Sequence, residues 1–424
     1  MKVAILTMFN GLSNTYSLVH IVSEQIKMLL ADHMDVRLLV TEHCKYEERW
    51  GIFLDPRIEW IPIINSENGD IFHWKTYTRA EDTIEPGFFH QVEIIKQDYV
   101  KYLQDIEVCI MHDILYQGVH LIHNVAIREA QKFLPKVKFL AFTHSAPSIH
   151  LEATYPMNCM FSEMPHTKFV YPTKCGLDAL SKQYNTQLSN CACVHNSLDI
   201  LIGMNQETRQ ICSRIDLYGS DIFIVCPGRL TMGKKFHIVA QLAGYISQYC
   251  NQKVAVVFCD FSCSDIDPRL YKQIIKDYGI KNGLKESDII FTSDVGFPNG
   301  VRRETVLELF TLSNLFVCPS FSESFGLTVI EAASRGNYIV LNEAVPALAE
   351  IGQQIGAYFM RWDAKNFGYD TYEQYHPSEA LYFIDQAQQI VRNMEQDSVL
   401  QAKTRIRTQY SNQWIYEHQL KILL

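Results

Sequence analysis

Residues 315–341 read LFVCPSFSESFGLTVIEAASRGNYIVL and contain a complete strand–loop–helix–strand unit. Both ends of this stretch are short apolar runs, LFVC and YIVL, which are typical of buried strands. Between them, the apolar residues of GLTVIEAASR have helical spacing, and Gly336 follows where glycine commonly ends a helix. Two strands joined by a crossover helix run parallel in one sheet. This unit therefore predicts an α/β fold built on parallel sheets.

The same alternation continues through the rest of the chain. Short apolar runs such as KVAILT, DIFIVC and VAVVFC alternate with longer amphipathic segments such as YSLVHIVSEQIKMLLADH. This pattern predicts helices on both faces of each sheet. With 424 residues the chain is too long for one ordinary core, and its strand signals weaken and restart between residues 200 and 220. We expect Rossmann-like domains over residues 1–205 and 206–405, with a final helix in residues 406–424 that packs on the first domain or the second.

Composition excludes several classes of protein. The net charge of −9 gives no overall attraction to nucleic acid or to an anionic membrane. The twelve cysteines form no CxxC pair, so the sequence supports neither a zinc knuckle nor a dithiol redox centre. No run of 18 apolar residues occurs, and the N-terminal MKVAILT is typical of a strand rather than of a signal peptide. We expect a cytoplasmic protein with reduced thiols.

Two clusters of charged residues follow predicted strands. Glu323 and Glu331 lie on either side of a predicted helix start, where free N–H groups and the helix dipole favour an anion. Upstream, CPGRLTMGKK places Arg229, Lys234 and Lys235 after another strand, and such cations suit phosphate oxygens. Taken separately, the two glutamates are as typical of an ordinary surface as of a binding site, and the basic residues are more often part of a solvated surface.

Together, GRLTMGKK (228–235) and PSFSESFGLTVIEA (319–332) resemble the C-terminal half of glycosyltransferase family 4, retaining enzymes of the GT-B fold. The N-terminal half agrees, since FTHS around His144, VHNSLDI (194–200) and MFNGLSN (8–14) are similar to motifs of that family. The sequence departs from the family at Ser197, at Tyr338 and at the strand end VVFCDFS, where glycine or proline is usual. The resemblance implies two Rossmann-like domains facing a central cleft.

The resemblance also implies a reaction and the residues that perform it. The reaction would be metal-independent transfer of a sugar, without a cofactor, from a nucleotide-diphosphate sugar (a UDP-sugar as first choice) to a hydroxyl acceptor. The residues expected in catalysis are His144, Glu323, Arg229 and Lys234. Those expected to bind the donor are Arg229, Lys234, Lys235 (the alternative to Lys234), Glu323 on the sugar, Phe325, Gly326, Leu327, Thr328 and Glu331 on the ribose. Those expected on the acceptor side are Gly11, Asn14 and Asp113.

Several alternatives stay open. The segment 60–95 is rich in aromatics with interleaved Lys75 and Arg79, and as a first-domain loop it could stack on a sugar or a splayed base, or simply pack on the domain. A saccharide or polyol acceptor is preferred, and a hydroxylated base in DNA is a remote alternative. Asp265-x-Asp267 could be a metal motif, although Asp before a helix is commonly a cap. A nucleotide-sugar epimerase or phosphorylase and a non-catalytic binding protein also remain.

Overall fold

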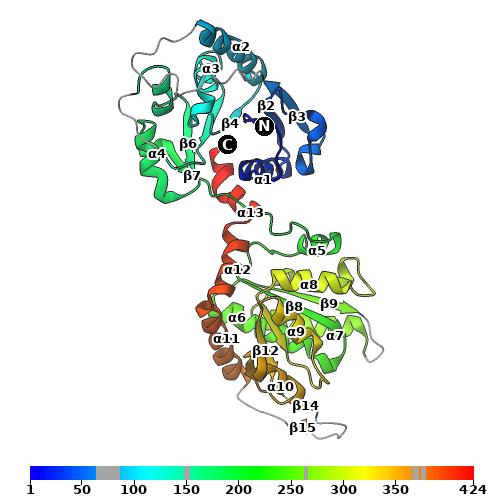
Figure 1. Cartoon of the computed structure of the whole chain (residues 1–424). Helices are drawn as coiled ribbons and strands as arrows, with labels where there is room; N and C mark the ends of the chain where they lie inside the picture. Colours follow the sequence, from blue (N-terminus) through cyan, green and yellow to red (C-terminus); the bar gives the residue numbers. More distant parts are fainter. Residues whose placement is uncertain (64–85, 148–152, 262–265, 363, 366–371, 374–378) are drawn as a thin grey trace. The chain divides into compact units, whose positions relative to one another are not determined.

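The computed structural model describes residues 1–63, 86–147, 153–261, 266–362, 364–365, 372–373 and 379–424. The chain forms two compact units, the first of Met1–Asp199 with Asn412–Leu424 and the second of Ile200–Ser411. These limits lie close to the expected boundaries at 205/206 and 405/406. The last residues belong to the first unit and lie against α1 (Ser17–Ala31), as the red segment in Figure 1 shows.

The described part of the first unit is built on a seven-stranded sheet in the order β3-β2-β1-β4-β5-β6-β7, and every neighbouring pair is parallel. Its strands are β1 (Lys2–Leu6), β2 (Asp35–Thr41), β3 (Ile58–Ile63), β4 (Val108–His112), β5 (Lys138–Phe142), β6 (Thr167–Tyr171) and β7 (Cys191–Cys193). Its helices are α1, α2 (Pro86–Leu103), α3 (Leu121–Gln131), α4 (Leu177–Gln183) and, at the end of the chain, α13 (Asn412–Ile415).

The described part of the second unit has a six-stranded parallel sheet in the order β10-β9-β8-β11-β12-β13. Its strands are β8 (Ile222–Arg229), β9 (Val254–Phe261), β10 (Ile289–Phe291), β11 (Leu315–Cys318), β12 (Tyr338–Asn342) and β13 (Tyr358–Met360), besides the short pair β14 (Ala364–Lys365) and β15 (Tyr372–Glu373). Its helices are α5 (Gln206–Cys212), α6 (Phe236–Cys250), α7 (Pro268–Lys281), α8 (Arg303–Leu312), α9 (Leu327–Ser334), α10 (Pro346–Ile355), α11 (Glu379–Gln396) and α12 (Ser398–Gln409).

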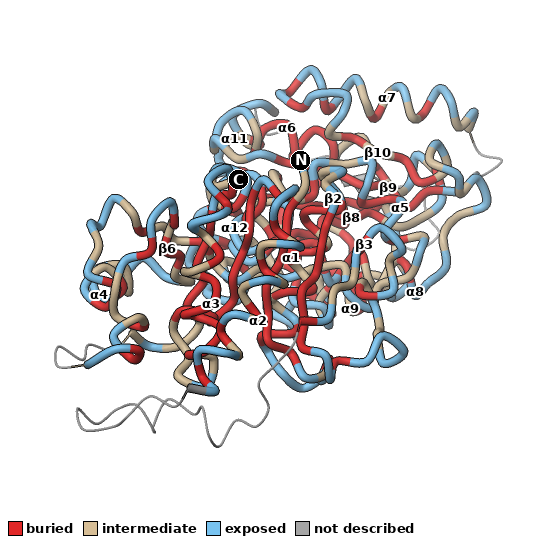
Figure 2. The backbone as a smooth tube through the Cα atoms, turned by 90° about the horizontal axis from the view of Figure 1, so that it is seen from above, coloured by how far each residue is buried: buried red, intermediate tan, exposed pale blue. Residues whose placement is uncertain are grey.

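Both sheets are covered on both faces. Successive residues of a strand point to opposite sides, so each strand contributes side chains to two cores. In β1, Val3 and Ile5 join the core that α1 covers, whereas Ala4 and Leu6 join the core under α2 and α3. In Figure 2 the central strands are almost wholly buried, whereas α7 alternates between buried and exposed residues. The near-continuous apolar strands of the sequence therefore follow from two-sided burial.

The strand order of each sheet reverses beside its first strand. The reversal falls between β1 and β4 in the first unit and between β8 and β11 in the second. Ligands of such sheets bind at the carboxyl ends of the strands at this point, because the adjoining loops diverge there. The prediction of two Rossmann-like, doubly wound parallel-sheet domains is confirmed. The expected cleft between them stays a prediction.

One prediction about the first unit is wrong. The segment 60–95 was expected to be a loop, but Trp60 lies in β3 and Phe88 is buried near the start of α2. Alternation is weak in IEWIPI because Pro62 interrupts it, which hid the strand. The aromatic residues between 64 and 85, with Lys75 and Arg79, lie outside the described residues.

Among the residues that the structure describes, no helix is both long and apolar enough to cross a membrane. The cytoplasmic location stays a prediction.

Candidate functional site

The loop after β8 carries the predicted phosphate-binding cations. Arg229 is the last residue of β8 and is exposed, and within the described chain its guanidinium has no ionic partner. A single 3-10 turn over Met232–Lys234 follows, and Lys235 then adopts a left-handed conformation (φ 51°) at the start of α6. This turn exposes Lys234 partly and buries Lys235, whose Nζ lies 5.4 Å from the ring centre of Phe321.

The loop after β11 meets this turn. β8 and β11 are adjacent parallel strands, so the loops after them leave the same edge of the sheet. The backbone N–H of Phe321 donates to the carbonyl of Gly233 at 2.8 Å, which ties the two loops together. The ammonium of Lys234 donates to the carboxylate of Glu323, and the side chains are 31% and 15% exposed. The structure therefore brings together two residues that are 89 positions apart, and it favours Lys234 over Lys235 as the cation at the carboxylate.

Gly326 begins α9 because its backbone is left-handed there (φ 91°), a conformation that favours glycine. A Cβ on Gly326 would also lie 3.1 Å from side-chain atoms of Val329 and Leu348. The flanking Phe325 and Leu327 are exposed, at 52% and 53%. These two apolar side chains lie beside Glu323, next to the first N–H groups of α9. Such free N–H groups at a helix start favour the binding of an anion.

Glu331 lies one turn further along α9 and is nearly buried, with 10% of its side chain exposed. Two nitrogens of Arg303, Nε and Nη2, approach the same Glu331 oxygen, Oε1, at 2.7 Å each. Arg303 is the first residue of α8 and is 66% exposed. The predicted ribose-binding carboxylate is thus held in one orientation by a residue that the sequence analysis did not single out. In the sequence, Arg303 was marked only by the pair Arg302-Arg303, which follows a long turn-rich stretch before α8.

The end of β9 holds a second unpredicted charged group. Asp260 is fully buried and accepts hydrogen bonds from Ser293 (N–H at 2.9 Å and Oγ at 2.5 Å), with Lys272 Nζ at 3.6 Å. This network occupies the strand end where the resembling family has glycine. Asp267 is an ordinary cap: its carboxylate accepts the N–H of Arg269 at 2.8 Å at the start of α7, and Asp265 lies outside the described residues.

In the first unit the loop after β1 is held in place by its own polar contacts. Thr41 Oγ1 donates to Asn10 Oδ1 at 2.8 Å, and the indole of Trp50 donates to the Leu12 carbonyl at 2.7 Å. The side chain of Asn14 is exposed, and the backbone carbonyl of Asn14 accepts a hydrogen bond from His20 Nε2 at 2.8 Å. No atom lies within 4 Å of a Cβ built on Gly11, so close packing does not require glycine there.

The strand ends of β4 and β5 gather His112, Asp113 and His144. Asp113 is buried and adopts a left-handed backbone (φ 56°), and its Oδ1 accepts the backbone N–H of His144 at 2.8 Å. His112 Nδ1 lies 2.9 Å from His144 Nε2, and the other ring nitrogen of His112 lies 3.1 Å from Gln25 Oε1. Burial raises the pKa of Asp113. The pKa of Tyr16, in the loop after β1, is raised first by burial and then by the nearby Asp113 carboxylate. The two predicted residues, Asp113 and His144, therefore form one local cluster.

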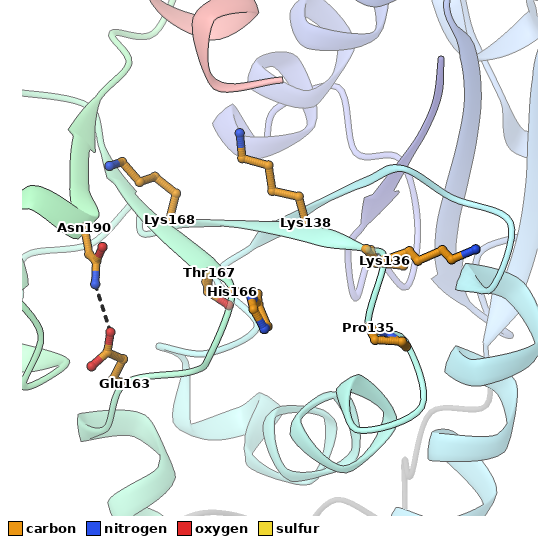
Figure 3. Close-up of a pocket in the computed structure, with 9 residues that line it drawn as sticks. Pro135, Lys136, Lys138, Glu163, His166, Thr167, Lys168 and Asn190 are labelled. Carbon is orange, nitrogen blue, oxygen red and sulfur yellow. Dashed lines mark hydrogen bonds between the residues drawn. The ribbon is translucent and has the colours of Figure 1, made fainter.

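A hollow of about 400 Å³ lies at the opposite edge of the first sheet, where β5 and β6 begin. Its lining holds none of the predicted site residues. In Figure 3, Lys136 extends the opposite way from Lys138 and Lys168, so the three ammonium groups do not converge. Glu163, on the rim of the hollow, accepts a hydrogen bond from Asn190 Nδ2 at 2.9 Å.

Within the described residues, no group of three or more His, Cys, Asp or Glu side chains could hold a metal ion.

Comparison with protein families gives one match. Residues 209–354 match the family model of glycosyl transferases group 1. The matched segment contains Arg229, Lys234, Glu323 and Glu331 and supports a glycosyltransferase. A search of curated proteins found no match.

Solved structures are similar along the whole chain, but remotely. A glycosyltransferase of Rickettsia africae has 15% identity and a TM-score of 0.37, covering 100% of this chain and 97% of that one. An α,α-trehalose 6-phosphate synthase of Burkholderia multivorans has 11% identity and a TM-score of 0.36, covering 100% and 96%. The HepE protein of Anabaena, in complex with UDP and glucose, has 12% identity and a TM-score of 0.35, covering 100% and 99%.

Proposed function

We propose that this protein is a retaining glycosyltransferase that moves a sugar from a nucleotide-diphosphate sugar, with a UDP-sugar as first choice, to a hydroxyl of a soluble acceptor. The observation that carries the proposal is the contact between Lys234 and Glu323 at the strand-order reversal of the second sheet. A cation and a carboxylate in contact suit the two halves of a sugar phosphate, because phosphate oxygens need a cation and sugar hydroxyls need an acceptor. The family match to residues 209–354 supports the glycosyltransferase part of this proposal.

In the proposed reaction the bond between the anomeric carbon and the β-phosphate oxygen breaks, and its electron pair stays on that oxygen. The acceptor hydroxyl forms the new bond to the anomeric carbon from the same face. Its proton passes to the departing phosphate oxygen, so the step needs no further base. Retention by this route is our preference because the motifs at the site include no evident nucleophile on the opposite face.

The protein would accelerate this step by stabilising the charge that grows on the diphosphate. Arg229 is free to bind a phosphate, whereas Lys234 would exchange part of its contact with Glu323 for phosphate oxygens. As Lys234 turns to the phosphate, Glu323 becomes available to the hydroxyls of the transferred sugar. Donors fixed in advance where charge develops are worth about 3 kcal/mol each. We propose that the reaction requires neither a metal nor a cofactor.

A transfer assay over UDP-, GDP- and ADP-sugars, with and without saccharide and polyol acceptors, tests the proposal. We expect one donor class to be consumed, free nucleotide to be released only when an acceptor is present, and the product to keep the anomeric configuration of the donor. Glu323→Gln should lose most of this activity. Glu343→Gln is the matched control, because Glu343 also pairs with a cation, Arg361, at 3.0 Å. A protein that neither binds nor consumes any nucleotide sugar would contradict the proposal, and release of nucleotide without acceptor would favour the alternatives.

A further inference from the structure

Three side chains of the first unit form a continuous chain of hydrogen bonds that ends at a predicted catalytic residue. Gln25, from the buried face of α1, places Oε1 at 3.1 Å from His112 Nε2. His112, the last residue of β4, places Nδ1 at 2.9 Å from His144 Nε2. The two imidazole planes differ by only 17°, with ring centres 5.1 Å apart. The rings therefore meet nearly edge to edge, which directs an in-plane N–H of one at the in-plane lone pair of the other.

Both rings are neutral near pH 7, because burial lowers the pKa of His144 to about 4 and that of His112 well below its usual value. A neutral imidazole has one N–H donor and one lone-pair acceptor. An amide oxygen only accepts, so Gln25 Oε1 requires the proton of His112 on Nε2. His112 Nδ1 is then an acceptor, and His144 must donate to it from Nε2. The lone pair of His144 is left on Nδ1.

That remaining nitrogen is unusual. His144 Nδ1 is shielded from solvent and has no hydrogen-bond partner among the described residues. Buried polar atoms are nearly always paired, so an unpaired one calls for an explanation. The residue has little freedom to turn away from this position, because its own backbone N–H is held by Asp113 and its Nε2 by His112.

We propose that Gln25 and His112 are positioning residues that hold His144 as the Nε2–H tautomer, so that Nδ1 accepts a hydrogen bond from a hydroxyl of the bound substrate. The ligand part of this inference rests on the proposed function. The tautomer also selects chemically: at neutral pH, ionised phosphate and carboxylate oxygens offer only lone pairs and would be repelled by Nδ1. A sugar or acceptor hydroxyl supplies the proton that Nδ1 needs. His144 thus binds the hydroxyl-bearing part of the substrate and not the diphosphate.

The tautomer can be observed without any ligand. The full chain is labelled with ¹⁵N at its 15 histidines, and long-range ¹H–¹⁵N correlation spectra are recorded at pH 7, with His144→Gln used to assign the signals. We expect an unprotonated, imine-type Nδ1 and a protonated Nε2 for His144. A proton on His144 Nδ1 would overturn the proposal whatever reaction the protein catalyses.

The role of Gln25 is tested by Gln25→Leu, which removes the acceptor that orients His112. We expect His144 to populate the Nδ1–H tautomer in part, seen as a large shift or a second set of its nitrogen signals. Gln183→Leu, at another buried glutamine of the first unit, is the matched control and should leave them unchanged. An unchanged His144 tautomer in folded Gln25→Leu would remove Gln25 from the proposal. If that variant does not fold, the wild-type spectrum still decides the tautomer.

Ligand addition separates this inference from the proposed function. Addition of UDP-glucose should shift the His144 Nδ1 signal toward a hydrogen-bonded acceptor, whereas UDP alone should not. If UDP alone produces the same shift, the partner of Nδ1 is not a hydroxyl of the transferred sugar, and the proposal is wrong. If neither compound binds, UDP-glucose, from the first-choice class of donors, is excluded, while the tautomer result still stands or falls by itself.

Discussion

The pair formed by Arg303 and Glu331 allows a sharp test of the proposal that the second unit binds a nucleotide. Replacing Arg303 by methionine keeps most of the length of the side chain but removes both N–H groups that bind Glu331 Oε1 at 2.7 Å. Glu331 stays in place but loses the partner that fixes its orientation. We expect the Arg303→Met protein to remain folded and to bind UDP more weakly.

The size of the effect follows from burial. Hydrogen bonds to a charged group contribute about 1.5–3 kcal/mol when shielded, but Arg303 is 66% exposed, so water replaces part of this contact. In the variant, the side chain of Glu331 is free to move before UDP binds. Fixing it on binding costs about 1 kcal/mol of side-chain entropy. Because 1.4 kcal/mol corresponds to a factor of ten, the Kd for UDP should rise about fivefold.

The adjacent residue provides the control. Arg302 is 60% exposed and pairs with Glu207 at 2.9 Å, so Arg302→Met removes the same charge from the same end of α8 without touching Glu331. Both substitutions also remove a cation that the helix dipole disfavours, by about the same amount. Isothermal titration with UDP should show weaker binding for Arg303→Met alone. Equal affinities for the two variants, whether weakened or not, would refute a positioning role for Arg303.

Three further outcomes are expected. Arg229→Ala should lower the rate of sugar transfer about a hundredfold, or about 3 kcal/mol, with an unchanged circular dichroism spectrum, and a wild-type rate would remove Arg229 from the site. Asp260→Ala should cost about 2–4 kcal/mol in the free energy of unfolding, measured by urea denaturation, because it leaves buried donors without an acceptor; a loss below 1 kcal/mol would contradict this. The first unit should lose stability as the pH falls from 6.5 to about 4, since burial lowers the pKa of His123 to about 3 and that of His144 to about 4, so the unfolded chain binds protons that the folded unit excludes. Equal urea midpoints for this unit at pH 7 and pH 5 would show that these rings titrate normally.

The sequence predicted well what short-range patterns determine. The alternation of apolar runs and amphipathic segments identified the parallel sheets, because strands buried on both faces have a distinctive composition. The strand–loop–helix unit that ends at Gly336 is present as expected, with Gly326 and Gly336 both in left-handed conformations. The strand β3 was missed because Pro62 obscures its pattern.

The candidate site was predictable only in part, because its decisive contacts join residues far apart in the sequence. Strand ends singled out Arg229, Lys234 and Glu323, and the family resemblance linked them, but no pattern indicated that Lys234 rather than Lys235 reaches the carboxylate. That choice depends on a single turn that leaves Lys234 partly exposed and buries Lys235. The partners Arg303 and Gln25 were not predictable: the Arg-Arg pair is a weak signal for Arg303, and a glutamine on a buried helix face is common.

The path of the chain has a consequence for how the protein is made. Ile415, Tyr416 and Leu420 are buried in the same core as Val3 and Ile5 of the central strand. Tyr416 also donates to Asp32 at 2.6 Å, and Gln419 accepts the backbone N–H of His195 at 2.7 Å. A ribosome synthesises the entire second unit before these residues emerge. The first unit must therefore wait with the core under α1 incomplete, while the second unit can fold on its own residues, so the half of the protein made first is the half completed last.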